Sequence, residues 1–250
     1  MNLIDRLLTQ SDVHESWRII LRQSLTEVDQ DYLNHLATDT HWLPGADSLF
    51  AAFRTDLLNL RYILIAESPY PRRESANGIA FFDATVESLW SENGLSKAVN
   101  RATSLRNIMK TAILAEGLQS ADKSGKLSQA LIAEMDKQKL ISTAPELFTG
   151  WQTAGFLLMN ATPVLDPNRK PAKEALFWTA FLDTLLELIE IQSKYPIKLV
   201  LWGKIAASID QLKGARHFER IQCEHPYNLS FIDNTEMRDL FASLKLLQKD

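Results

Sequence analysis

Four short apolar runs, separated by stretches long enough to form helices, constrain the fold of this chain more than any other feature. Three of them are almost continuously apolar, as strands covered on both faces are. The stretch 172–191, between two of the runs, repeats leucine and phenylalanine at helical spacing. This alternation predicts a three-layer α/β/α fold around a central, mostly parallel four-stranded sheet. The expected strands are Tyr62–Ala66, Phe156–Met159, Ile197–Trp202 and the less apolar Phe218–Cys223.

No internal repeat, low-complexity tract or proline-rich linker interrupts the 250 residues, so we expect a single domain over 1–250. Residues 1–60 are expected to be helical, because apolar side chains recur there at helical spacing in two places. These are Trp17, Ile20, Leu21 and Leu25 and, after a Pro-Gly break, Leu49, Phe50, Phe53 and Leu57. The polar segment from about 115 to 145 is predicted to be a helical excursion on the surface.

Charge and cysteine content exclude several classes of protein. The 27 basic and 31 acidic side chains give a formal net charge of -4, so any contact with nucleic acid must be a local patch. The one cysteine, Cys223, excludes an internal disulfide and clusters held by several thiolates, and it fits a reducing compartment. Neither a basic leader nor 18 consecutive apolar residues occur. We therefore expect a cytoplasmic, soluble monomer with no membrane contact, no metal and no cofactor.

Hydrogen-bonding and aromatic residues directly follow the predicted strands. In an open parallel sheet, ligands bind beyond the carboxyl ends of the strands, so these segments are expected to converge on one pocket. The segments are 67–71 after the first strand, 160–163 after the second, 203–204 after the third and 225–230 after the fourth.

In this order, the segments resemble the motifs of the family-1 uracil-DNA glycosylases, which cleave the N-glycosidic bond of uracil in DNA. Ala66-Glu67-Ser68-Pro69-Tyr70-Pro71 is similar to the family's Gly-Gln-Asp-Pro-Tyr-His. His225-Pro226-Tyr227-Asn228-Leu229-Ser230 is similar to His-Pro-Ser-Pro-Leu-Ser. The resemblance covers nearly the whole chain. It also includes Gly78-Ile79-Ala80-Phe81, Ser104-Leu105-Arg106-Asn107-Ile108, the segment from Trp151 to Asn160, the trio Trp178, Phe181 and Asp183, and Leu201-Trp202-Gly203.

The resemblance implies that Asn160, Tyr70 and Phe81 hold a uracil swung out of the DNA helix. The Asn160 amide would accept from N3–H and donate to O4, whereas cytosine offers the reverse pattern. Tyr70 would exclude the methyl group of thymine, and Phe81 would stack on the base. The alternatives are structural: an asparagine that closes a turn, and aromatic side chains that pack in the core.

The same resemblance assigns three catalytic residues. His225 would donate a hydrogen bond to uracil O2 as negative charge develops on the departing base. Ser68 stands where the family has the aspartate that orients the attacking water. Glu67 precedes it and is a candidate substitute, although successive side chains of an extended segment face opposite ways. Because Ser68 replaces the family's aspartate, we expect a slow or altered glycosylase.

DNA contacts are also implied. Leu229 would wedge into the gap left by the extruded base, or it would pack the loop onto the domain. Ser104 and Ser230 would bind phosphates through hydroxyl and backbone N–H groups, with Arg72 and Arg73 adding positive charge. The arginines could equally be solvated surface residues.

Three functions are therefore compared. The first is a glycosylase of base excision repair that acts on uracil or a related damaged base in DNA. The second is a non-catalytic module of the same fold that binds uracil or DNA. The third is a small hydrolase with Ser68 as nucleophile and His225 as base, which the lack of a Gly-x-Ser-x-Gly turn disfavours.

Overall fold

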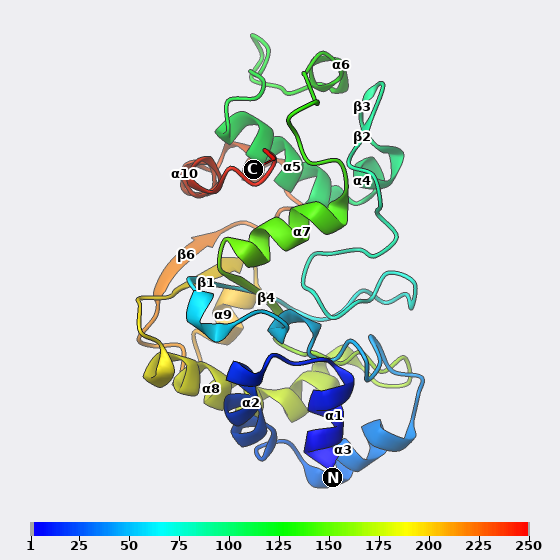
Figure 1. Ribbon diagram of the computed structural model, residues 1–250, viewed down its shortest axis with the longest axis vertical. Coiled ribbons are helices and arrows are strands. Elements are labelled where there is room, and N and C mark those ends of the chain that lie inside the picture. Colours follow the sequence, from blue (N-terminus) through cyan, green and yellow to red (C-terminus); the bar gives the residue numbers. More distant parts are fainter. Residues whose placement is uncertain (1–2, 250) are drawn as a thin grey trace. The chain divides into compact units, whose positions relative to one another are not determined.

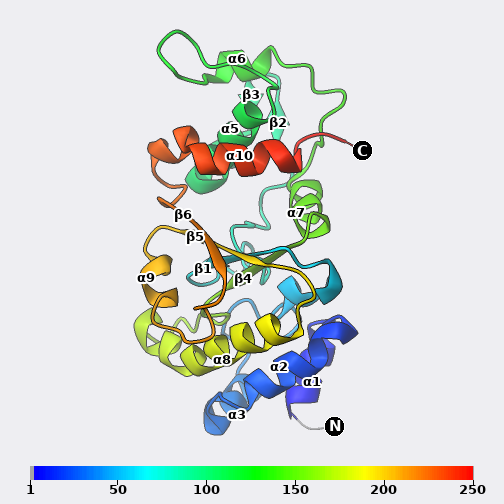
Figure 2. The same cartoon turned by 90° about the vertical axis from the view of Figure 1, so that its left-hand side faces the viewer.

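The computed structural model describes residues 3–249, which divide into two compact units (Figures 1 and 2). Unit 1 holds residues 3–80, 155–201 and 205–221. Unit 2 holds residues 81–154, 202–204 and 222–249. The expectation of a single domain over 1–250 stays a prediction. No helix within residues 3–249 is long and apolar enough to cross a bilayer.

A four-stranded sheet with the order β4-β1-β5-β6 lies at the centre of unit 1 (Figure 1). The strand β1 (Tyr62–Ala66) pairs in parallel with β4 (Phe156–Asn160) and with β5 (Lys198–Trp202). The strand β6 (Glu219–Cys223) forms an edge. Only the last residues of β5 and β6 belong to unit 2. The predicted α/β fold with helices flanking a four-stranded sheet is confirmed, because continuously apolar strands need cover on both faces.

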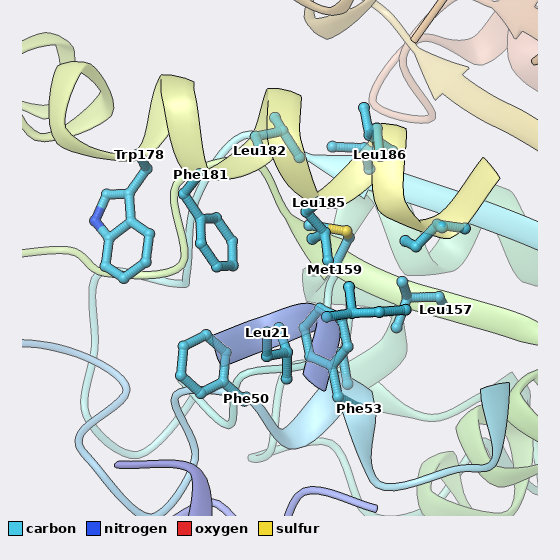
Figure 3. Packing of buried hydrophobic residues seen from close by; sticks show 14 of the residues in the cluster. Leu21, Phe50, Phe53, Leu157, Met159, Trp178, Phe181, Leu182, Leu185 and Leu186 are labelled. Carbon is cyan, nitrogen blue, oxygen red and sulfur yellow. The ribbon is translucent and has the colours of Figure 1, made fainter. Parts of the chain in front are cut away.

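The long helix α8 (Pro171–Gln192) covers one face of this sheet and builds the core of unit 1. Its buried side chains recur three or four residues apart and therefore share one face. In Figure 3, Phe181 and Leu185 of this row extend from α8 toward Leu21 of α2 (Arg18–Leu25) and toward Leu157 and Met159 of β4. The row consists of Trp178, Phe181, Leu182, Leu185, Leu186 and Ile189. Burying such a side chain stabilises the fold by about 1.5–3 kcal/mol.

Shorter elements complete both units. Unit 1 also contains α1 (Leu3–Gln10), η1 (Glu15–Trp17), α3 (Gln30–Thr38) and α9 (Ile205–Ile209). In unit 2, α5 and α10 pack against each other beneath a small hairpin (Figure 2). The elements of unit 2 are β2 (Trp90–Ser91), β3 (Gly94–Leu95), α4 (Lys97–Arg101), α5 (Thr103–Ala115), α6 (Gln129–Ala133), α7 (Ala144–Thr153), η4 (Leu229–Asp233) and α10 (Thr235–Leu244).

The second helix expected within residues 1–60 is absent, and that prediction was wrong. The segment 49–59 forms two 3-10 turns, η2 (Ala51–Phe53) and η3 (Leu57–Asn59). Asp56 interrupts the helical path, because its carboxylate accepts the N–H of Leu58 and starts the second turn. The apolar spacing is nevertheless real, since Phe50 and Phe53 are buried in the core.

The segment 115–145 is helical only over α6 and the start of α7, so the expectation of a helical excursion was largely wrong. Asp122 explains part of the difference. Its carboxylate accepts hydrogen bonds from the backbone N–H groups of Ser124 and Lys126, which closes a turn. Local bonds of this kind compete with the hydrogen bonds of a helix.

Candidate active site

The loops that leave β1 and β4 are joined by backbone hydrogen bonds. The N–H of Ala161 donates to the carbonyl of Ala66 at 2.8 Å, and the N–H of Thr162 donates to that of Glu67 at 3.0 Å. The strand register also places Ala66 beside Asn160. Unit 1 therefore holds the ends of β1 and β4, with Glu67 and Asn160, at one edge of the sheet.

Asn160 is the last residue of β4 and is 6% exposed. Its side-chain amide makes no hydrogen bond to any other group within residues 3–249. Its amide atoms are not among the buried side-chain atoms without a partner, so they reach solvent and are accessible to a ligand. The geometry favours a binding role for Asn160 over that of a residue that only closes a turn.

Glu67 and Ser68 both line a cavity of about 390 Å³ in unit 1. Its walls come from the connection between β4 and α8, from the first turns of α8 and from α9. Most of the lining residues are apolar, but Thr162, Ser208 and Glu174 also line it. Burial raises the pKa of Glu174 above its usual range. The cavity can hold water beside either Glu67 or Ser68.

The rest of the loop after β1 carries three further predicted residues. Tyr70 is half-buried, and Arg72 and Arg73 are exposed. The Arg73 guanidinium donates to the carbonyl oxygens of Thr40 and His41, at 2.9 and 3.1 Å. These bonds fix the Arg73 side chain along the surface of unit 1.

Unit 2 brings Phe81 and His225 together around Trp202. The Phe81 ring centroid lies 5.0 Å from that of Trp202 and 5.7 Å from that of His225. Phe81 has a φ of +63°, a left-handed conformation that bulky residues rarely adopt. Such strain persists only where the surroundings impose it, and it is concentrated at functional sites. The neighbouring Phe82 instead stacks on Phe148, so the two adjacent phenylalanines have separate places.

His225 is held by the backbone that follows it. The N–H of Tyr227 donates to His225 Nδ1 at 3.1 Å. In a neutral imidazole the nitrogen that accepts a hydrogen bond carries no proton, so Nε2 carries it. A neutral His225 in this arrangement can therefore donate a hydrogen bond from Nε2.

The segment after His225 exposes two large side chains. Leu229 is 69% exposed and Tyr227 is 67% exposed. Ser230 is exposed as well. The carboxyl of Glu224 accepts hydrogen bonds from its own backbone N–H and from the Ser230 hydroxyl. These bonds hold its pKa below the usual range. Ser104 is half-buried in the first turn of α5, where backbone N–H groups lack partners within the helix.

Each unit thus gathers part of the predicted site. Unit 1 carries Glu67, Ser68, Tyr70, Arg72, Arg73 and Asn160, and unit 2 carries Phe81, Ser104, His225, Leu229 and Ser230. No role was predicted for Trp202, Gly203 or Asn107. In the structure, Trp202 contacts Phe81, Gly203 lies against His225, and Asn107 donates to the carbonyl of Pro226. The signal for Gly203 was its position after a strand in a chain with only nine glycines.

Comparison with known proteins identifies the family. A model of the Uracil DNA glycosylase superfamily matches residues 53–245. The chain is 22% identical to the uracil-DNA glycosylase of Streptococcus gordonii over 222 residues, which are 87% of this chain and 85% of that protein. It is 23% identical to the uracil-DNA glycosylase of Caenorhabditis elegans over 225 residues, 86% of this chain and 67% of that protein.

A solved structure matches as well. The crystal structure of wild-type UNG from Nitratifractor salsuginis superposes with a TM-score of 0.92 at 39% identity, covering 99% of this chain and 97% of that chain. The family match spans more than half of the chain, and the structural match spans nearly all of it. This protein therefore belongs to the uracil-DNA glycosylase superfamily.

Proposed function

We propose that this protein is a DNA glycosylase that hydrolyses the N-glycosidic bond of uracil, or of a related damaged base, in base excision repair. The observation that carries the proposal is its membership of the uracil-DNA glycosylase superfamily over most of its length. We also propose that it acts as a monomer in the cytoplasm on DNA that contains uracil.

Base recognition is assigned to Asn160, Tyr70 and Phe81. The unpaired amide of Asn160 matches the N3–H donor and O4 acceptor of uracil. Cytosine reverses this pattern, and each buried group left unsatisfied would cost about 1–3 kcal/mol. Tyr70 is assigned to exclude a methyl group at C5, and Phe81 to stack on the base.

Departure of the base is assigned to His225. When the glycosidic bond breaks, its electron pair stays with uracil and negative charge gathers at O2. The Nε2–H of neutral His225 would donate to O2 and stabilise that charge. A donor of this kind is worth about 10²–10³-fold in rate.

The attacking water is assigned to Ser68 or Glu67. Water adds to the anomeric carbon, so that its oxygen forms the new bond and one of its protons is released. Ser68 can orient the water through one hydrogen bond, and the Glu67 carboxylate can accept the proton. The base leaves as the uracil anion, which becomes free uracil when it takes up the proton released by the water, and an abasic site remains. Glu67 and Ser68 both line a cavity in unit 1.

The remaining assigned residues bind DNA. Leu229, exposed on its loop, would fill the gap left by the extruded nucleotide. Ser104 and Ser230 would contact phosphates. Arg72 and Arg73 would provide local positive charge in a protein whose formal net charge is -4.

A uracil-containing single-stranded oligonucleotide with a fluorescent end tests the proposal. Abasic sites are converted to strand breaks with alkali, and the same oligonucleotide with cytosine in place of uracil is the control. We expect product with the wild-type protein, and losses of about 10²-fold or more in H225Q and N160A. Product at the level without enzyme would refute the glycosylase. If the wild-type protein binds the oligonucleotide without cleaving it, and N160A no longer binds it, the protein is the non-catalytic binding module instead.

A further inference from the structure

Asn107 is a buried asparagine of α5 whose side chain contacts the loop that follows His225. It has no exposed surface. Its Nδ2 lies 2.7 Å from the carbonyl oxygen of Pro226, 3.3 Å from that of Asn228 and 3.5 Å from that of Tyr227. The residues joined by the shortest contact are 119 positions apart in the sequence. All of these residues belong to unit 2.

The chemistry of the amide dictates how it is oriented. Three carbonyl oxygens surround one end of the side chain, and only the NH₂ group has hydrogens to donate to them. One N–H is directed to Pro226, and the two longer contacts share the other. The Oδ1 end lies 3.5 Å from Nε of Arg106, which is a donor. A side chain without an amino group would leave the buried Pro226 carbonyl without this donor.

Residues 226–228, whose carbonyl groups contact Asn107, are called the clamped segment. This segment orients His225. The N–H of Tyr227, between two of the clamped carbonyls, donates to His225 Nδ1 at 3.1 Å. The N–H of Asn228 donates to the carbonyl of His225 at 2.9 Å and closes the turn. Holding the peptide groups of residues 226–228 therefore holds the N–H that selects which ring nitrogen of His225 is protonated.

We propose that Asn107 is a positioning residue that fixes the ring and the tautomer of His225 through the backbone of residues 226–228. This inference rests on the proposed glycosylase function for its effect on catalysis, but not for its effect on the histidine. A displacement of about 1 Å at a reacting group can lower a rate about 10²-fold, so the consequence for turnover is large.

The tautomer of His225 is measured first in the wild-type protein, by proton–nitrogen correlation NMR with nitrogen-15 histidine. We expect Nδ1 to be the unprotonated nitrogen in the neutral ring. In N107A we expect the two nitrogen shifts to move toward the values of a mixture of tautomers, and kcat to fall about 10- to 100-fold with little change in KM. Protonated Nδ1 in the wild-type protein would overturn the proposal without any variant.

The variant N107D adds a readout that a merely structural role would not move. Its carboxyl group has the shape of the amide and can donate to Pro226 only when protonated. We expect the kcat of N107D relative to wild type to fall as pH rises through the titration of the introduced carboxyl, and to recover at lower pH. A ratio that does not vary with pH would contradict the proposal.

Asn100 supplies the matched control, because its amide is bonded within unit 2 but away from the loop. It donates to the carbonyl of Leu95 at 3.0 Å and accepts from Gln129 at 2.9 Å. We expect N100A to change neither the histidine shifts nor kcat. If the nitrogen chemical shifts of His225 are unchanged in folded N107A, the proposed role of Asn107 is refuted, whatever the activity of the variant. Altered shifts in a protein that never excises uracil would refute the proposed function and leave the clamp standing.

Discussion

Gly203 and His225 approach so closely that a Cβ built on Gly203 would lie 2.8 Å from the Cβ of His225. Gly203 also has a φ of +79°, which residues other than glycine rarely adopt. Its N–H donates to the carbonyl of Cys223 at 2.9 Å, just before the histidine. The glycine at the end of β5 thus makes room for His225.

Replacing Gly203 by alanine should displace His225. Because the clash is with the Cβ of the histidine rather than with the tip of a flexible side chain, the ring must shift. We expect G203A to lower kcat for uracil excision by about 10²-fold. Single-turnover measurement of abasic product checks the value.

Gly125 provides the control for backbone strain. It has a φ of +78° and nothing within 4 Å of an added Cβ. G125A should therefore suffer a similar conformational cost, about 1 kcal/mol or somewhat more, and keep its activity. Equal losses of activity in G203A and G125A would show that strain, and not contact with His225, is responsible.

Placing an aspartate at position 68 should accelerate excision. A carboxylate can accept the water's proton and favour the cationic sugar, whereas the Ser68 hydroxyl offers one hydrogen bond. We expect S68D to raise kcat at least about tenfold, toward the lower part of the 10²–10⁴-fold range of general-base catalysis. The comparison uses the same uracil oligonucleotide as the parent. If S68D changes nothing and E67Q abolishes turnover, the water is activated by Glu67.

Removing the Tyr32 hydroxyl should destabilise unit 1. The hydroxyl donates to the carboxyl of Glu174 and accepts from Trp178 Nε1, and both partners are fully buried. Leaving them without this hydroxyl should cost about 1–3 kcal/mol per group, measured as the free energy of unfolding in urea. Y62F is the control, because the Tyr62 hydroxyl makes no hydrogen bond within residues 3–249. A loss in Y32F no larger than in Y62F would contradict this account.

Cys223 should react slowly with alkylating agents in the folded protein. Burial, followed by the charges of Glu224 and Glu236, raises the pKa of its thiol to about 12 from a usual value of 9.0. The reactive thiolate is therefore about a thousandfold scarcer at pH 7.5 than for an ordinary cysteine. The rate with iodoacetamide should rise tenfold per pH unit well above pH 9 and reach ordinary values in denaturant. Because the folded pKa is raised, ionisation of this thiol should also weaken the fold as pH rises above 9.

The local pattern of the sequence was sufficient to predict the four strands and α8. Their apolar runs and helical spacing are properties of neighbouring residues, and the strands begin and end within one residue of the expected positions. Asn160 and His225 could be proposed for the same reason, because Asn160 directly follows the second run and His225 comes two residues after the fourth. The segment 49–59 was wrongly predicted to be one helix. Its apolar spacing fits a helix, but Asp56 caps a separate 3-10 turn and interrupts it.

The contacts between residues far apart in the chain could not be predicted from the sequence. The left-handed backbone of Phe81, the close approach of Gly203 to His225 and the bond from Asn107 to Pro226 leave no periodic signal in the sequence. Each depends on how distant segments pack, whereas a strand or helix is set by the alternation of apolar and polar side chains along its own length. The residues proposed for the chemistry could therefore be named from local sequence patterns and motifs, whereas the packing of distant segments sets the orientation of His225.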